Sequence, residues 1–166
     1  NSKGVNTKFF GHPFMDVERL NETRTQFFRK HSLNQKYKLI ALLPGSRQQE
    51  VVKHWNIYIK TIALLRKEIP SLQVVIAKSN NTKFPVIDKS FKVENNAKKA
   101  IIASDVAIVA SGTATLECAV EKTPFVTCYK VSWLTWFLAK YFVKVKYSSI
   151  VNLIADKEVV PEFLQS

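Results

Sequence analysis

The sequence of 166 residues has few cysteines and no long apolar run. Cys118 and Cys128 are too few for a disulfide scaffold, and their spacing matches no metal-binding motif. No stretch approaches the roughly 20 uninterrupted apolar residues that a membrane-spanning helix needs. The first residues, Asn1 to Gly4, include neither a start methionine nor an apolar signal segment. We therefore expect a cytoplasmic protein in reducing surroundings, and we expect this sequence to be a fragment.

The sequence also lacks the patterns of several common enzyme classes. It contains no Gly-x-Gly-x-x-Gly after a predicted strand and no Gly-x-x-x-x-Gly-Lys-Ser/Thr. Its three histidines, His12, His31 and His54, are scattered, and no Ser/His/Asp set accompanies them. These absences disfavour a dinucleotide-binding domain and exclude a P-loop nucleoside triphosphatase. We expect neither a metal nor a cofactor.

Acidic residues are scarce beside basic ones: 13 Asp and Glu stand against 25 Lys and Arg, a net charge of +12. Such an excess attracts polyanions, whether nucleic acid, anionic lipid surfaces or phosphorylated substrates. A solvated basic surface explains the charge equally well. The lysines are spread along the chain, and no zinc-finger spacing, RNP-like aromatic run or helix-turn-helix pattern accompanies them. A nucleic-acid-binding module thus stays as an alternative only.

The apolar residues that are present follow a strand-then-helix pattern. Leu39 to Leu43 is a continuous apolar run ending at Pro44-Gly45, which predicts a buried strand that meets a turn. Behind it, apolar residues recur at four- and three-residue steps, as on one face of a long helix that Pro70 closes. These residues are Val51, Trp55, Tyr58, Ile62, Leu65 and Ile69.

The same alternation continues towards the C-terminus. Further strands are predicted at Leu72–Ala77, Asp105–Ala110 and Pro124–Tyr129, and helices at Asn95–Ser104 and through Thr115, Leu116 and Ala119. This order predicts an α/β fold, a Rossmann-like parallel sheet with helices on both faces. Residues 1–38 are more polar, so we expect a linker and an initial helix there, Val17 to Lys30, before a Rossmann-like lobe over residues 39–166. Ser79 to Thr82 is predicted to be a loop.

The turn from Pro44 to Glu50 follows the first predicted strand, at the edge where open parallel sheets bind ligands. Gly45 allows a tight turn, and Ser46 with Gln49 has the spacing of a capping box, which predicts that the helix begins there. Free N–H groups of that helix end, together with Arg47, would bind an anion such as phosphate. An ordinary capped helix with a solvent-facing arginine is the alternative.

A second turn, Ala110 to Glu117, presents a glycine and three hydroxyls at another predicted helix start. Glu117 lies about one turn inside that helix and could accept hydrogen bonds from two vicinal hydroxyls, as on a ribose. Simple complementarity with the helix dipole is the alternative. Two such turns in one sheet predict a nucleoside diphosphate held between helix ends.

The segment from Ser132 to Lys146 predicts an amphipathic helix. Its apolar stripe comprises Leu134, Phe137, Leu138, Tyr141, Phe142 and Val145, and a separate flank carries Trp133, Trp136, Lys140 and Lys144. Trp beside Lys on an outward flank is typical of a helix that rests on an anionic membrane surface. Packing of the Trp pair against another domain or subunit is an equal alternative.

Taken together, these motifs and several shorter ones resemble one family, the lipid-A-disaccharide synthases, which are bacterial glycosyltransferases of the GT-B type. The similarity follows the family's order and covers almost the whole chain. The stretches that carry it are Gly11 to Asp16, Leu42 to Val51, Ala103 to Asp105, Ala110 to Glu117, Tyr129-Lys130, Leu138 to Lys140, Val143-Lys144, Asn152 to Ala155 and Glu158 to Glu162.

The resemblance implies two Rossmann-like lobes with the active site between them, of which this chain is similar to the C-terminal, donor-binding lobe. The family joins UDP-2,3-diacylglucosamine to 2,3-diacylglucosamine 1-phosphate in a β-1,6 linkage and releases UDP. It works without a required metal, at the inner face of the cytoplasmic membrane. By resemblance, the donor pocket is lined by Gly45, Ser46, Arg47, Glu50, Ser111, Gly112, Thr113, Glu117 and Asn152. Asn152 rests on the resemblance alone.

Other implications concern what this chain lacks. The family's catalytic base is a carboxylate of the N-terminal lobe, so we expect no catalytic residue in this fragment and no transfer by it alone. The family also suggests a homodimer. The chain departs from the family's pattern at Val151, Asp156 and Trp133, where Pro, Gly and Pro are common. Another UDP-sugar enzyme of the GT-B type, such as a peptidoglycan glycosyltransferase or a UDP-N-acetylglucosamine 2-epimerase, remains an alternative.

Overall fold

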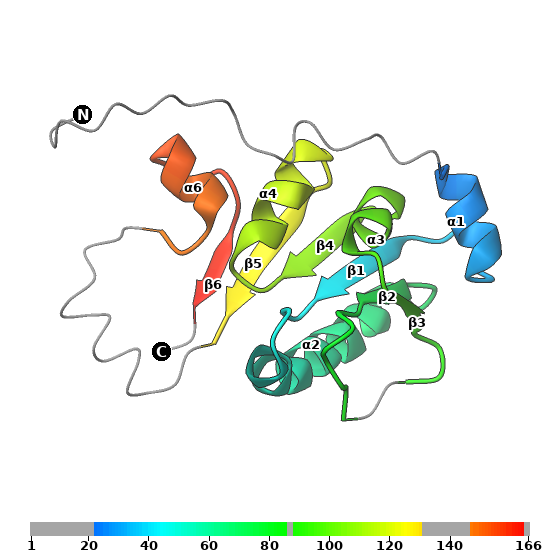
Figure 1. The fold of residues 1–166 in the computed structure, drawn as a ribbon. Coiled ribbons are helices and arrows are strands. Elements are labelled where there is room, and N and C mark those ends of the chain that lie inside the picture. Colours follow the sequence, from blue (N-terminus) through cyan, green and yellow to red (C-terminus); the bar gives the residue numbers. More distant parts are fainter. Residues whose placement is uncertain (1–21, 86–87, 131–146, 165–166) are drawn as a thin grey trace, which may run out of the picture.

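A computed structural model describes residues 22–85, 88–130 and 147–164 and shows one parallel sheet with helices on both faces (Figure 1). The strands lie in the order β3-β2-β1-β4-β5-β6, and every neighbouring pair is parallel. The strands are β1 (Leu39–Leu43), β2 (Gln73–Ala77), β3 (Lys92–Glu94), β4 (Val106–Val109), β5 (Phe125–Tyr129) and β6 (Glu162–Leu164). The helices are α1 (Arg24–Lys30), α2 (Gln48–Glu68), α3 (Ala97–Ala103), α4 (Thr113–Val120) and α6 (Ile150–Ala155). The predicted α/β, Rossmann-like class is confirmed.

The central strand β1 is buried along its whole length and serves both faces of the sheet. Side chains of a strand alternate between faces, so Leu39, Ala41 and Leu43 pack with α1, α3 and α4, while Ile40 and Leu42 pack with α2. This explains why the run is continuously apolar rather than alternating.

The long helix α2 covers its face of the sheet through the stripe that the sequence predicts. Val51, Trp55, Tyr58 and Ile62 are buried, whereas Ile69 lies just beyond the last helical residue and is exposed. The helix ends before Pro70, because the residue preceding a proline is disfavoured in the helical region.

A buried carboxylate ties α1 to the end of β3. Glu94 accepts hydrogen bonds from Lys30 Nζ at 2.7 Å and from the N–H of Asn96 at 3.0 Å, and His31 Nε2 lies 3.0 Å away. Burial alone would raise the pKa of Glu94, but these contacts outweigh it and lower the pKa to about 2 from an ordinary 4.5. The cluster therefore stabilises the fold fully above about pH 4.5 and loses this contribution as the pH falls towards 2.

Several short elements differ from the predictions. Within the described residues α1 begins at Arg24, where Thr23 accepts a hydrogen bond from the N–H of Gln26, and Val17 lies outside the described residues. The strand β3, the helix α6 and the strand β6 were not predicted; each has three to six residues, too few to show a period. After α6, Asp156 adopts a left-handed conformation (φ 47°), which explains why glycine suits this position. Among the described residues, no helix is both long and apolar enough to cross a bilayer.

Candidate functional site

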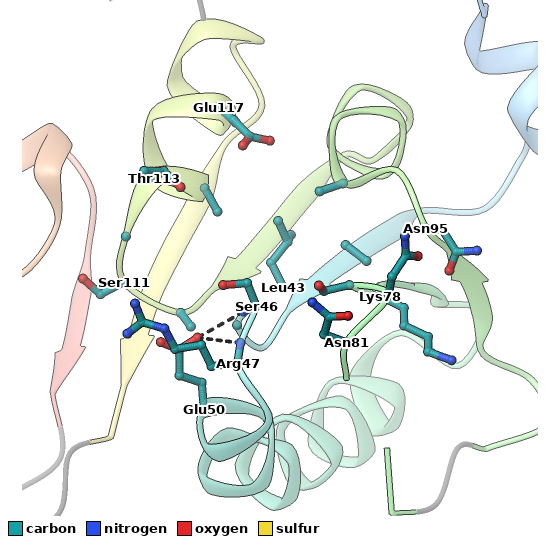
Figure 2. A pocket seen from close by; sticks show the side chains of 18 residues that line it. Leu43, Ser46, Arg47, Glu50, Lys78, Asn81, Asn95, Ser111, Thr113 and Glu117 are labelled. Atoms are coloured by element: carbon teal, nitrogen blue, oxygen red, sulfur yellow. Dashed lines mark hydrogen bonds between the residues drawn. The ribbon is translucent and has the colours of Figure 1, made fainter. Parts of the chain in front are cut away.

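A cleft of about 630 Å³ lies at the carboxyl ends of the strands (Figure 2). Both turns predicted from the sequence line it: Gly45, Ser46, Arg47 and Glu50 on one side, and Ser111, Gly112, Thr113 and Glu117 on the other. The two turns meet because β1 and β4 are neighbours. Eight of the nine residues assigned to a donor pocket are thus brought together.

The first turn is held by the carboxylate of Glu50. Its Oε2 accepts hydrogen bonds from the N–H groups of Ser46 and Arg47, at 3.0 and 3.2 Å, as Figure 2 shows. The predicted Ser46–Gln49 capping box is therefore wrong: α2 begins at Gln48, with Arg47 as its N-cap residue. Since a carboxylate is the stronger acceptor, Glu50 rather than Gln49 closes the turn.

This arrangement corrects the expectation of free N–H groups only in part. The N–H groups of Ser46 and Arg47, which precede α2, donate to Glu50, so a negative ligand there meets a carboxylate. Those of Gln48 and Gln49, the first residues of α2, have no hydrogen-bond partner among the described residues. Gly45 is required for this turn, because φ is +122° and an added Cβ would collide with the Glu50 side chain. The guanidinium of Arg47 stays available: its side chain is exposed, and none of the described carboxylates forms an ion pair with it.

The second turn also ends at a helix start, and its residues line the cleft. Gly112 has φ +125°, which an L-residue rarely adopts, and α4 begins directly after it. In the part of the chain that the structure describes, the N–H groups of Thr113 and Ala114 have no hydrogen-bond partner. Of the predicted hydroxyls, Ser111 donates to the carbonyl of Ser148 and Thr115 to that of Gly112, both at 2.7 Å. The anion site therefore depends more on amides than on hydroxyls.

Glu117 lines the cleft from α4, one turn inside the helix. It is half-buried. Burial raises the pKa of its carboxyl, Lys98 opposes this, and Glu121 adds to it. Lys98 is itself paired with Glu121, at 3.1 Å. Glu117 thus offers acceptor oxygens to a ligand, although its charge is lost at a higher pH than that of an exposed glutamate.

The cleft has a third, amide-rich side that the sequence analysis did not assign to a site. Lys78, Ser79, Asn80 and Asn81 follow β2, and Asn95 follows β3. The predicted strand ending at Ala77 could have indicated the first four residues, because they leave the sheet at the same edge as the two turns. Asn95 was predicted only as the start of a helix, and its place at the edge of the sheet was missed because β3 was not predicted.

Asn152 lies outside this cleft. Its Nδ2 donates to the carbonyl of Val160 at 2.8 Å and to Glu162 Oε1 at 2.7 Å. Its Oδ1 accepts from the N–H groups of Val159 and Val160, at 2.8 and 3.0 Å. A primary amide has two donor hydrogens and two acceptor lone pairs, so every one is used within the chain.

The same amide supports the second turn indirectly. Glu162 also accepts from the N–H and hydroxyl of Ser148 and from the N–H of Ser149. Burial would raise the pKa of Glu162, but these donors lower it. Since the carbonyl of Ser148 accepts from Ser111, the network of Asn152 and Glu162 holds the residue against which Ser111 rests.

Two further expectations concern other parts of the molecule. The residues assigned to a membrane contact, Trp133, Trp136, Lys140 and Lys144, lie outside the described residues. Across residues 22–85, 88–130 and 147–164, no group of three or more His, Cys, Asp or Glu side chains could hold a metal ion.

Comparison with known proteins finds one family. The sequence model of the family described as lipid-A-disaccharide synthetase matches residues 1–166. Lipid-A-disaccharide synthase 1 of Legionella pneumophila (strain Lens) is 37% identical over 98% of this chain and 44% of its own length. The lipid-A-disaccharide synthase of Solibacter usitatus (strain Ellin6076) is 34% identical over the same shares, and that of Psychromonas ingrahamii (strain DSM 17664 / CCUG 51855 / 37) is 35% identical over 97% and 45%. The chain spans less than half the length of these relatives.

Substitution of Asn152 distinguishes a structural amide from a ligand-binding one. Asn152→Ala leaves the N–H groups of Val159 and Val160 without their acceptor, so it should lower the free energy of unfolding by about 2–3 kcal/mol in urea denaturation. Ile154→Ala, on the exposed side of the same helix, should change it by less than about 0.5 kcal/mol. An Asn152→Ala protein as stable as the original would contradict the structural role.

Proposed function

Since this chain belongs to the lipid-A-disaccharide synthetase family, we propose that it supplies the UDP-sugar-binding lobe of a glycosyltransferase. The reaction joins UDP-2,3-diacylglucosamine to 2,3-diacylglucosamine 1-phosphate in a β-1,6 linkage and releases UDP. Residues 39–166 form the donor-binding lobe, and residues 1–38 form the connection and initial helix before it. The observation that carries the proposal is the convergence of two glycine-containing turns in one cleft.

The diphosphate lies between the two helix starts. The N–H groups of Thr113 and Ala114, which no other described residue pairs with, lie at the positive end of α4, where phosphate oxygens are stabilised. Arg47 approaches from the first turn as a bidentate cation. Because Glu50 already occupies the amides of Ser46 and Arg47, it orients Arg47 rather than binding the anion itself.

The nucleoside is recognised by the remaining polar side chains of the cleft. Glu117 accepts hydrogen bonds from the two ribose hydroxyls, for which its carboxylate has suitable oxygens. The amides of Asn80, Asn81 and Asn95 supply both donors and acceptors, as the edge of a uracil ring requires. Asn152 acts through Ser148 and Ser111 rather than by contact with the donor.

We expect the catalytic base and most of the acceptor site in the N-terminal lobe, as the family resemblance implies; this chain covers 44% of the length of the Legionella pneumophila relative. The residues described here bind and orient the leaving group, UDP, and Arg47 and the α4 amides stabilise the negative charge that develops on it. A chain limited to these residues should bind UDP without transferring the sugar.

Association with an anionic membrane and a homodimer complete the proposal. The substrates carry acyl chains, so the enzyme works at a lipid surface, and the basic excess of +12 favours an anionic one. The flank of Trp133, Trp136, Lys140 and Lys144 is the sequence feature suited to that surface. The nucleic-acid alternative has the charge as its only support.

The role of Arg47 is tested by calorimetric titration with UDP. Arg47→Ala should weaken binding by about 1.5–3 kcal/mol, the range for a charged hydrogen bond, and Arg47→Lys should also lose much of the affinity because the planar fork is lost. Lys53→Ala removes an exposed cation from α2, outside the cleft, and is the matched control. Arg47→Ala and Lys53→Ala proteins of equal affinity would reject the clamp.

Titration with 2′-deoxy-UDP and with duplex DNA tests the nucleoside contact and the nucleic-acid alternative. The 2′-deoxy form of UDP should bind more weakly than UDP, because Glu117 loses one of its partners. Any binding of duplex DNA should weaken steeply as the salt concentration rises. Tight DNA binding without measurable UDP binding would favour the nucleic-acid alternative.

Membrane association is tested by co-sedimentation with lipid vesicles. The protein should partition onto anionic vesicles more than onto neutral ones, and salt should reduce this binding. Replacing Trp133 and Trp136 together with Ser should reduce it while leaving UDP affinity unchanged, because neither residue belongs to the two turns. Unchanged vesicle binding by a folded double variant would place the lipid contact elsewhere.

A further inference from the structure

A buried histidine on α2 links the first turn of the cleft to the end of β5. His54 is fully buried, its Nδ1 lies 2.9 Å from the carbonyl oxygen of Pro44, and its Nε2 lies 2.9 Å from the backbone nitrogen of Lys130. A carbonyl can only accept a hydrogen bond and a backbone N–H can only donate one. The imidazole is therefore neutral, with its proton on Nδ1 and its lone pair on Nε2.

The two partners of His54 follow strands that are not neighbours in the sheet. Pro44 follows β1 and Lys130 follows β5, and β4 lies between those strands. Pro44 directly precedes Gly45, the residue of positive φ that opens the first turn. The imidazole thus connects this turn by hydrogen bonds to the end of β5, the second strand over from β1 in the sheet. The rings of Tyr58 and Tyr129 lie beside the imidazole, with centroids 6.1 and 5.4 Å from its own.

We infer that His54 is a positioning residue for the donor-binding turn: its neutral imidazole orients the Pro44 carbonyl and, through it, the backbone that carries Ser46 and Arg47. The inference rests on the proposed function for what this turn binds. Neither motif of the sequence includes His54, and its place in the sequence, seven residues after Arg47, gives no sign of the contact with Lys130.

This connection is sensitive to acid because only the neutral ring can accept from Lys130. Protonation would set an N–H on Nε2 against the N–H of Lys130 and remove that hydrogen bond. Burial lowers the pKa of His54, the Pro44 carbonyl and Glu50 raise it, and Lys53 and Lys130 lower it. With the pKa below its ordinary 6.5, the contribution of His54 to stability is complete above pH 6.5 and is lost as the pH falls through the lowered pKa.

Nuclear magnetic resonance tests the connection without any ligand. At pH 7 the ring nitrogens of His54 should show the neutral Nδ1–H tautomer. His54→Leu should shift the backbone amides of Gly45, Ser46 and Arg47, whereas Tyr58→Phe should not, because the buried Tyr58 hydroxyl has no hydrogen-bond partner among the described residues. A charged ring, an Nε2–H tautomer, or turn amides that are unchanged in a folded His54→Leu protein would overturn the inference.

UDP titrations of the same variants test the link to binding. His54→Leu should weaken UDP binding about tenfold, whereas His54→Gln, which can donate to Pro44 and accept from Lys130, should stay within about threefold. Protonation of His54 should contribute to a fall in UDP affinity between pH 7 and pH 5. Gln has no titrating group, so the fall should be smaller in the His54→Gln protein. If His54 acts through the turn, adding His54→Leu to a protein that already carries Arg47→Ala should lower UDP affinity by less than about twofold.

The two hypotheses fail in different ways. If the unmodified protein binds no UDP, the proposed function fails, and the tautomer and turn amides still decide the role of His54. If UDP binds and the Leu, Gln and unmodified proteins have equal affinities and equal pH dependence, His54 does not position the donor site. A loss of affinity by His54→Leu that adds fully to that of Arg47→Ala would also reject action through this turn.

Discussion

The pairing of β1 with β4 is the constraint on which the cleft depends. The two strands run parallel and in register from Ile40 to Leu43, and the N–H of Ala110 donates to the carbonyl of Leu43 at 2.8 Å. This bond joins the last residue of one strand to the first residue of the turn that follows the other. Two glycine turns 67 positions apart in the sequence, at Gly45 and Gly112, therefore open into one space.

The two sides of this cleft attract an anion through different groups. On the first turn the carboxylate of Glu50 consumes two backbone donors, which leaves Arg47 as the cation that faces a ligand. On the second turn the amides of Thr113 and Ala114 have no partner within residues 22–85, 88–130 and 147–164. A dianionic group is thus attracted by an exposed guanidinium on one side and by the N–H groups of a helix start on the other. Such a division suits a diphosphate better than a single carboxylate.

Periodicity predicted four of the six strands, and the strand-end turns predicted two sides of the cleft, because both follow from local sequence. The full set of pocket residues, Glu50 among them, came from the family resemblance. The start of α2 could not be predicted, since both Ser46–Gln49 and Arg47–Glu50 have capping-box spacing, and the stronger carboxylate acceptor decides between them. The short strand β3 has no period to detect, so the place of Asn95 at the edge of the sheet was missed. The contacts of Asn152 and His54 join distant segments, and only the fold shows that both side chains are fully used.

Amide shifts on titration with UDP test most directly whether both turns bind one UDP molecule. UDP should shift the backbone amides of Thr113 and Ala114 and the side-chain resonances of Arg47 with a single common dissociation constant. Amides near the exposed Lys60 of α2 should stay unchanged. UDP that saturates the protein while leaving the α4 amides unshifted, or shifts that follow exposed lysines outside the cleft, would contradict binding by both turns.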